Sequence, residues 1–141
     1  YGWIHKMTME NTNVLVDFII TGDDYDINEI STLLKIEPNK YWKKGEAIRH
    51  TGKNRTYTGW IFSTGYEETL DINTQLKKIE YLFQDKSDIL IELKTKYKLE
   101  YCVEIVIKIN HNEIPAMYLE TEMINFASAI GASFDFDTYI N

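Results

Sequence analysis

The sequence predicts a single α+β domain, a two-layer sandwich with three helices on one face of a sheet. The sheet is expected to be mostly antiparallel (mixed), with about five strands. Strand-like and helix-like segments follow the order β-α-β-α-β-β-α-β, and each helix-like segment has one apolar stripe to bury. The last three strand-like segments alternate apolar and charged residues, which is typical of a sheet with one wet face. Helices on one side and water on the other satisfy both patterns.

Length and composition set the domain boundaries. The chain has 141 residues, of which 44% are hydrophobic and 13% aromatic, enough for one packed core. We assign residues 14–141 to the domain and residues 1–13 to an N-terminal extension. Met7 or Met9 is a candidate natural start, which would make the preceding residues an upstream or expression-derived addition.

Cysteine usage and hydropathy predict a cytoplasmic protein with no membrane partner. Cys102 is the only cysteine, so no internal disulfide can form and a reducing compartment is expected. No apolar run approaches the roughly 18 residues that span a bilayer, and no signal-peptide pattern opens the chain.

The expected strands differ in pattern. The first, 14–20, is apolar on both faces apart from Asp17, which suggests an interior position in the sheet. Segments 89–97 and 101–109 both alternate with a period of two and are predicted to form an antiparallel hairpin. Segments 57–64 and 133–140 complete the set.

The expected helices carry recognisable ends. Asp26, followed by Glu29, has the spacing of a capping box before the first helix. A second helix is predicted over 72–83 and a third over 118–130, with Gly131 placed as a C-terminal cap.

A basic loop, residues 40–55 (KYWKKGEAIRHTGKNR), interrupts an acidic chain. It holds six cations and one acid, a charge of +5. Because the net charge of the chain is −7, the other 125 residues together carry −12. Cations beside aromatic rings can hold an anion or stack on a base, whereas a solvated loop would only neutralise nearby acids. For the first alternative the cations must converge. Within this loop, Gly45 is expected to turn with positive φ. The candidate ligand-binding residues are Trp42, Lys43, Lys44, Arg49, Arg55 and Trp60.

Acidic residues supply a second candidate surface. Asp135 and Asp137 project from the same face of the last strand, and Glu104 and Asp17 are expected to join them on the open side of the sheet. Paired acids can bind a divalent metal, do acid–base work or dock a basic partner. Alternating Asp can also simply keep an exposed sheet face soluble.

Catalytic motifs are not found. The three histidines form no metal-binding pair, and the sequence has no nucleophile elbow, Walker loop or dinucleotide fingerprint. Glu104, two residues after Cys102 on the same face, should raise the pKa of that thiol, opposite to what a nucleophile needs. We assign no catalytic residue, metal or cofactor. An enzyme that uses the basic loop as a substrate clamp remains a third option.

Several short motifs extend from the first strand to the end of the chain. They are F-x-I-x-G (Phe18 to Gly22), I-x-x-L-L-x-I-x-P (Ile30 to Pro38), W-x-K-G-E (Trp42 to Glu46), G-W (Gly59, Trp60) and G-A-x-F-D-F-D-x-Y (Gly131 to Tyr139). Together they resemble domain-of-unknown-function family 4279, a group of small bacterial and phage proteins. The resemblance implies a stand-alone domain with no assigned activity, and the gene neighbourhoods of some members suggest toxin–immunity roles.

Two functional hypotheses follow. The first is a non-enzymatic protein-interaction module, such as an immunity-type or inhibitor protein, that docks a basic partner on the acidic sheet face. The alternative is binding of a small anionic ligand, a nucleotide or phosphorylated metabolite, at the basic-aromatic loop 40–60. The net charge of −7 argues against wrapping nucleic acid.

Overall fold

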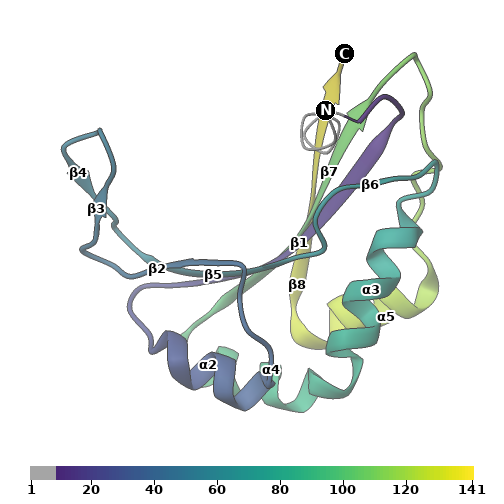
Figure 1. Cartoon of the computed structure of the whole chain (residues 1–141). Helices are drawn as coiled ribbons and strands as arrows, with labels where there is room; N and C mark the ends of the chain where they lie inside the picture. Colours follow the sequence, from purple (N-terminus) through teal and green to yellow (C-terminus); the bar gives the residue numbers. More distant parts are fainter. Residues whose placement is uncertain (1–8) are drawn as a thin grey trace.

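The computed structural model describes residues 9–141 and has two layers, with the helices on one face of a curved sheet (Figure 1). The α+β class and the mostly antiparallel, mixed sheet are therefore confirmed. The face of the sheet turned away from the helices carries no helix in this part of the chain. Of the predicted extension, residues 1–13, residues 1–8 lie outside the described part of the chain.

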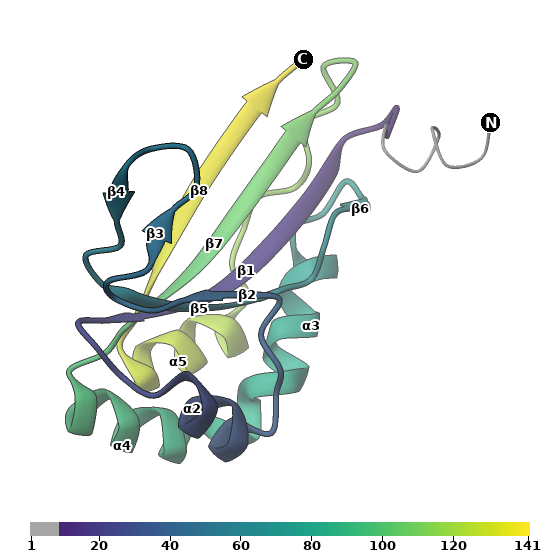
Figure 2. The same cartoon turned by 60° about the vertical axis from the view of Figure 1, so that its left-hand side comes forward.

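The sheet has the strand order β2-β5-β1-β7-β8, with β6 beside the start of β1. Neighbouring strands are antiparallel except for β7 and β8, which run parallel. Two further strands, β3 and β4, form a hairpin that projects beyond the end of the sheet, away from the helices (Figures 1 and 2). The strands are β1 (Asn13–Gly22), β2 (Lys40–Trp42), β3 (Ala47–Ile48), β4 (Lys53–Asn54), β5 (Thr58–Ser63), β6 (Glu67–Glu68), β7 (Glu100–Ile109) and β8 (Ala132–Ile140).

The described residues form four α-helices, one more than predicted. A single 3₁₀ turn, η1 (Gln84–Lys86), joins two of them. The predicted strand over 89–97 is wrong, because this segment is helical, and the expected hairpin with 101–109 does not form. The helices are α2 (Ile27–Leu34), α3 (Asn73–Phe83), α4 (Ser87–Tyr97) and α5 (Thr121–Ile130).

Helix α4 forms because its apolar residues also fit a helical period. Leu90 and Leu93 are buried three residues apart, whereas Ile91, which a strand would have placed beside Leu93, is 44% exposed. The Leu, Glu and Lys residues of the segment favour a helix, and this preference and the burial of Leu90 outweigh the β-branched Ile89 and Ile91. The helix ends at Lys98, which adopts the left-handed conformation with φ 54°, as Lys35 does with φ 58° at the end of α2.

The predicted helix caps are confirmed in part. The Asp26 side chain accepts hydrogen bonds from the backbone N–H groups of Asn28 (2.9 Å) and Glu29 (3.4 Å), and Gly131 ends α5 with φ +67°. The second half of the capping box is absent. Glu29 instead accepts hydrogen bonds from the Tyr97 hydroxyl and from Lys96 (3.2 Å), which ties α2 to α4.

The folded domain begins earlier than the predicted boundary at residue 14. The side chain of Thr12 is buried, and its hydroxyl donates to the carbonyl of Asn110 at 3.3 Å. In return this hydroxyl accepts a hydrogen bond from the Asn110 N–H at 3.1 Å. Residues 11 and 12 therefore close the end of the sheet rather than extend from it.

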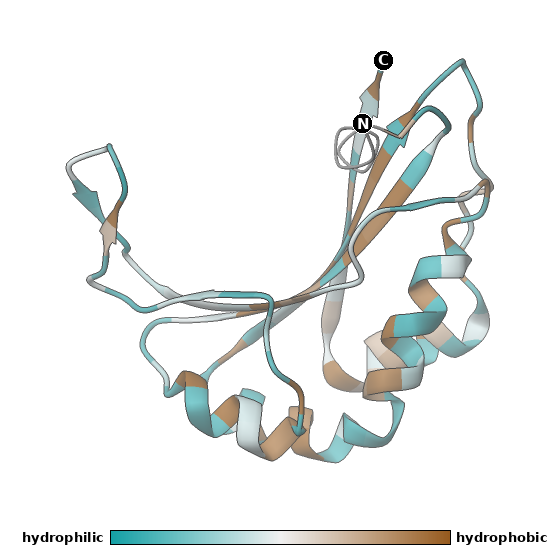
Figure 3. Cartoon of the chain, viewed as in Figure 1, coloured by the Kyte–Doolittle hydropathy of each residue, from teal (hydrophilic) through white to brown (hydrophobic). Residues whose placement is uncertain are grey.

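An aromatic cluster joins the helices to the sheet. Phe83, at the end of α3, stacks on Phe18 of β1 with ring centroids 4.4 Å apart, and Trp60 and Phe62 of β5 meet it edge-on. Trp60 is fully buried, as the sequence predicts, and its Nε1–H donates to the Ser31 hydroxyl at 3.0 Å. Apolar colouring runs along β1 and β7 beneath these helices (Figure 3).

We expect Trp60→Ala to lower the free energy of unfolding by about 3–5 kcal/mol, because it removes a large buried ring and leaves a cavity. Chemical denaturation monitored by circular dichroism measures this change. Tyr81→Ala is the matched control, since Tyr81 is 78% exposed and its loss should change stability by less than about 0.5 kcal/mol. Equal effects of the two substitutions would contradict the placement of Trp60 in the core.

Candidate functional site

The open face of the sheet carries an acidic row, defined here as Asp17, Glu104, Asp135 and Asp137. Asp17 of β1 is paired in register with Glu104 of β7, and Glu104 with Asp135 of β8. Residues paired in this way point to the same face, and Val16 and Phe18 on either side of Asp17 are buried against the helices. The four predicted acids therefore lie together on the face that the helices leave open.

Ionisation of Glu104 is disfavoured by its surroundings in the acidic row. Burial raises the pKa of Glu104, and the charges of Asp17, Asp135 and Asp137 raise it further. Burial also raises the pKa of Asp17, against the opposing effects of a hydrogen bond with Ser63 and of the Lys40 charge. One carboxylate oxygen of Asp17 is buried without a hydrogen-bond partner among residues 9–141. The row is thus crowded and incompletely satisfied at Asp17, whereas Asp137 accepts a hydrogen bond from the Tyr139 hydroxyl at 2.9 Å.

Apolar side chains frame the acidic row on both sides. On one side, Ile19 of β1 is paired with Ile61 of β5 and Cys102 of β7; on the other, Leu15 is paired with Val106. Apart from Val106, which is buried, these side chains are only partly buried. The aliphatic flanks give this surface apolar contact area, and its carboxylates can steer and orient a partner of opposite charge.

The apolar flanks were not predicted as functional residues, although their signal is present in the sequence. Segment 14–20 is apolar on both faces apart from Asp17, a pattern that predicts an interior position in the sheet. The strand is interior to the sheet, but only one of its faces is covered. The second apolar face therefore indicates a surface left for contact.

Cys102 behaves as predicted from its neighbour Glu104. Burial raises the pKa of its thiol, and the nearby charges of Asp135 and Glu104 raise it further, against a hydrogen bond with Ser133 that lowers it. The thiolate is the reactive form of cysteine, so this site disfavours a nucleophilic role.

The described part of the chain, residues 9–141, lacks two further features. No group of three or more His, Cys, Asp and Glu side chains is arranged to hold a metal ion. None of the helices there has both the length and the apolar character needed to cross a membrane.

The cations of the basic loop do not converge on one point. Lys43 pairs with Asp24 at 2.7 Å and Lys44 with Asp23 at 2.8 Å, both across to the loop after β1. Arg49 lies at the tip of the β3–β4 hairpin and is exposed. This arrangement matches the alternative in which loop cations neutralise neighbouring acids.

The two tryptophans proposed for ligand stacking are both buried against other residues of the protein. Trp60 belongs to the core and offers no free face. Trp42 is buried on the open side of the sheet, against Gly59 of the neighbouring strand β5. The guanidinium of Arg55 lies 4.6 Å from the centre of the Trp42 ring, and Tyr57 meets this ring edge-on.

Gly45 and Arg55 close the base of the projecting hairpin. The Gly45 N–H donates to the carbonyl of Arg55 at 2.8 Å, and the Arg55 N–H donates to the carbonyl of Glu46 at 2.7 Å. Gly45 has φ +93°, which confirms the positive φ predicted for it. The loop is thus an ordered arm, and its cations are distributed along it.

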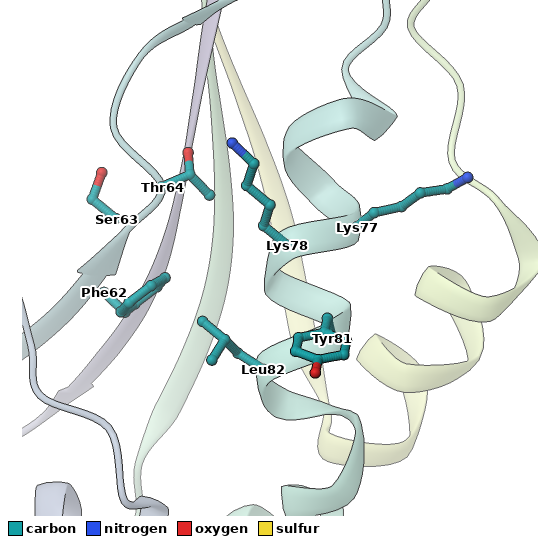
Figure 4. Close-up of a pocket in the computed structure, with 7 residues that line it drawn as sticks. All are labelled: Phe62, Ser63, Thr64, Lys77, Lys78, Tyr81 and Leu82. Carbon is teal, nitrogen blue, oxygen red and sulfur yellow. The ribbon is translucent and has the colours of Figure 1, made fainter.

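A groove lies between β5 and α3 on the helix side of the sheet (Figure 4). It has a volume of about 390 Å³, with Phe62 and Leu82 facing each other across it. Its two cations are already engaged, since Lys78 pairs with Glu67 at 2.8 Å and Lys77 with Glu120 at 3.5 Å. The groove therefore lacks a charged group free to orient a ligand.

Gly59→Ala should destabilise the fold by about 1–3 kcal/mol, because a Cβ there would lie 2.2 Å from the Trp42 ring. Urea denaturation of a double-mutant cycle with Trp42→Ala tests the cause. With the ring removed, the added methyl group should cost much less. An equal cost in both backgrounds would show that the close approach of Trp42 does not require Gly59.

Glu104→Gln should raise the free energy of unfolding at neutral pH by roughly 0.2–1 kcal/mol, because it removes a like charge between two paired strands. The raised pKa values of Asp17 and Glu104 mean that the folded state binds protons more tightly at these groups. Protonation of both carboxyls therefore raises the free energy of unfolding as the pH falls through the raised pKa values towards the ordinary values of 3.8 and 4.5.

Denaturation of the wild type and of Glu104→Gln across this pH range measures the difference. Glu29→Gln is a control of opposite sign, because hydrogen bonds from Tyr97 and Lys96 lower the pKa of Glu29. Its loss should reduce stability at neutral pH. A loss of stability in Glu104→Gln at neutral pH would contradict the proposed repulsion.

Comparison with known proteins identifies a family for nearly the whole chain. The family model described as "Domain of unknown function (DUF4279)" matches residues 10–141. No curated protein and no solved structure gave a match. The matched region includes every described strand and helix, among them the strands that carry the acidic row. The chain belongs to the DUF4279 family.

Proposed function

We propose that this protein is a non-enzymatic interaction module that binds a basic protein at the acidic row. The observation that supports this most directly is the alignment of Asp17, Glu104 and Asp135 across three adjacent strands of an uncovered face. The framing by aliphatic side chains gives the same surface apolar contact area.

A basic partner would relieve the electrostatic cost that the acidic row carries. A lysine or arginine placed over the row lowers the mutual repulsion of the carboxylates and donates hydrogen bonds to them. The buried Asp17 oxygen that lacks a partner in the described residues is one such acceptor. The net charge of −7 would also steer a basic protein towards this one at long range.

Within this proposal, the partner class that fits best is a basic bacterial or phage protein, such as a nuclease that an immunity-type or inhibitor protein would neutralise. Acidic inhibitors gain association rate and specificity against basic enzymes in this way. A cytoplasmic location suits such a role, because the partner would be met inside the cell.

The geometry favours this reading over an anionic ligand at the basic loop. Lys43 and Lys44 are paired with aspartates, and Arg55 is stacked on Trp42. Binding an anion there would require breaking these contacts. No lysine or arginine within residues 9–141 forms an ion pair with a carboxylate of the acidic row.

Binding to basic nucleases and to the products of neighbouring genes, measured by biolayer interferometry, tests the proposal. We expect Asp135→Asn/Asp137→Asn to weaken binding at least about tenfold, and added salt to weaken it further. Asp88→Asn/Glu92→Gln on α4 is the matched control, since it removes the same charge from exposed positions of the helix layer. This control should bind as the wild type does.

A different pattern would support the anionic ligand instead. Thermal stabilisation by nucleotides or polyphosphate that is lost in Arg49→Ala/Arg55→Ala, with no protein bound at the acidic row, would contradict the interaction proposal.

A further inference from the structure

Strand β8 forms a long edge of the sheet that is paired on one side only. It has nine residues and is hydrogen-bonded to β7, and no strand of residues 9–141 lies on its other side. The opposite edge is different, because β2 has three residues and the chain then leaves the sheet for the β3–β4 hairpin. Figures 1 and 2 together show that this hairpin does not cover β8. Every second residue of such an edge turns its N–H and C=O groups outward, ready to pair.

The two faces of β8 differ in chemistry. Asp135 and Asp137 point to the open face as part of the acidic row. Phe134 and Phe136 point to the helix face, where Phe136 is 44% exposed. Ile140, on the same side, is 75% exposed. The free edge thus has carboxylates above it and incompletely covered apolar side chains below it.

Pairing with a second copy of this chain is disfavoured by the same residues. Antiparallel pairing of two β8 strands centred on Phe136 would place Asp135 opposite Asp137 of the second copy. A shift of two residues in either direction keeps the apolar side chains on one face and still places Asp135 opposite Asp135, or Asp137 opposite Asp137, of the second copy. Like charges directly opposite one another destabilise a strand pair. A strand of opposite charge has no such cost.

We propose that the basic partner adds a β-strand to the free edge of β8, and that this strand alternates Lys or Arg with apolar residues. Its cations would lie beside Asp135 and Asp137 on the open face, and its apolar side chains beside Phe134 and Phe136 on the helix face. Backbone hydrogen bonds would supply affinity and the alternation would supply specificity. This inference rests on the proposed function and specifies how the partner engages the acidic row.

A nine-residue fluorescent peptide that alternates Lys and Val is the probe. We compare it with a peptide of the same composition whose Lys and Val residues are grouped in two blocks. Two further versions of the alternating peptide carry N-methyl groups on all Lys amides or on all Val amides. Fluorescence anisotropy measures affinity, and amide hydrogen exchange measures protection of residues 132–140.

Strand addition predicts one pattern. The alternating peptide binds at least about tenfold more tightly than the block peptide, and alternate amides of β8 become protected. One N-methylated version loses binding and the other retains it, because only one edge of the added strand pairs with β8. Asp135→Asn/Asp137→Asn weakens binding at least about tenfold, and the control Asp88→Asn/Glu92→Gln does not.

Other outcomes overturn the proposal and separate it from the proposed function. Equal binding of all peptides without protection of β8 leaves charge recognition at the acidic row and excludes strand addition. Binding of a basic protein at the acidic row, with no peptide bound, does the same. A dimer in sedimentation analysis whose β8 amides are already protected assigns the edge to a second copy. No binding by any peptide or basic protein removes both proposals.

Discussion

The one-sided burial of β1 is the constraint on which the rest of the structure depends. Val14, Val16, Phe18 and Ile20 are fully buried under the helices, so the residues between them must face the other way. Because β1 is the middle strand, its register with β5 and β7 aligns the side chains of its neighbours on both faces. The same alternation therefore builds the aromatic cluster on one side and the acidic row on the other.

Features that depend on a few adjacent residues could be predicted from the sequence. The cap at Asp26, the helix end at Gly131 and the positive φ of Gly45 each follow from one residue in a local pattern. The placement of Glu104 and Asp135 on one face follows from strict alternation within β7 and β8. The shared open face of Asp17 was also predicted, whereas its register with Glu104 depends on the pairing of β1 with β7.

Features that depend on contacts between distant segments could not be predicted. Segment 89–97 fits both periods, and the choice is made by the pocket that receives Leu90, where Tyr101 donates to its carbonyl at 2.6 Å. Lys43 and Lys44 resemble ligand-binding residues until the loop after β1 brings Asp23 and Asp24 to them. The different roles of Trp42 and Trp60 follow from which face of the sheet each one occupies, which the basic loop itself does not reveal.

The projecting β3–β4 hairpin has a consequence for how this fold can vary. Its base is closed by the backbone hydrogen bonds between Gly45, Glu46 and Arg55, and none of its residues from 46 to 54 belongs to the hydrophobic core. The chain leaves and re-enters the domain at one point, so the length and composition of this branch are uncoupled from the folding of the body. Substitutions and length changes in residues 46–54 should therefore be tolerated, and a foreign peptide could be displayed in their place on an intact scaffold.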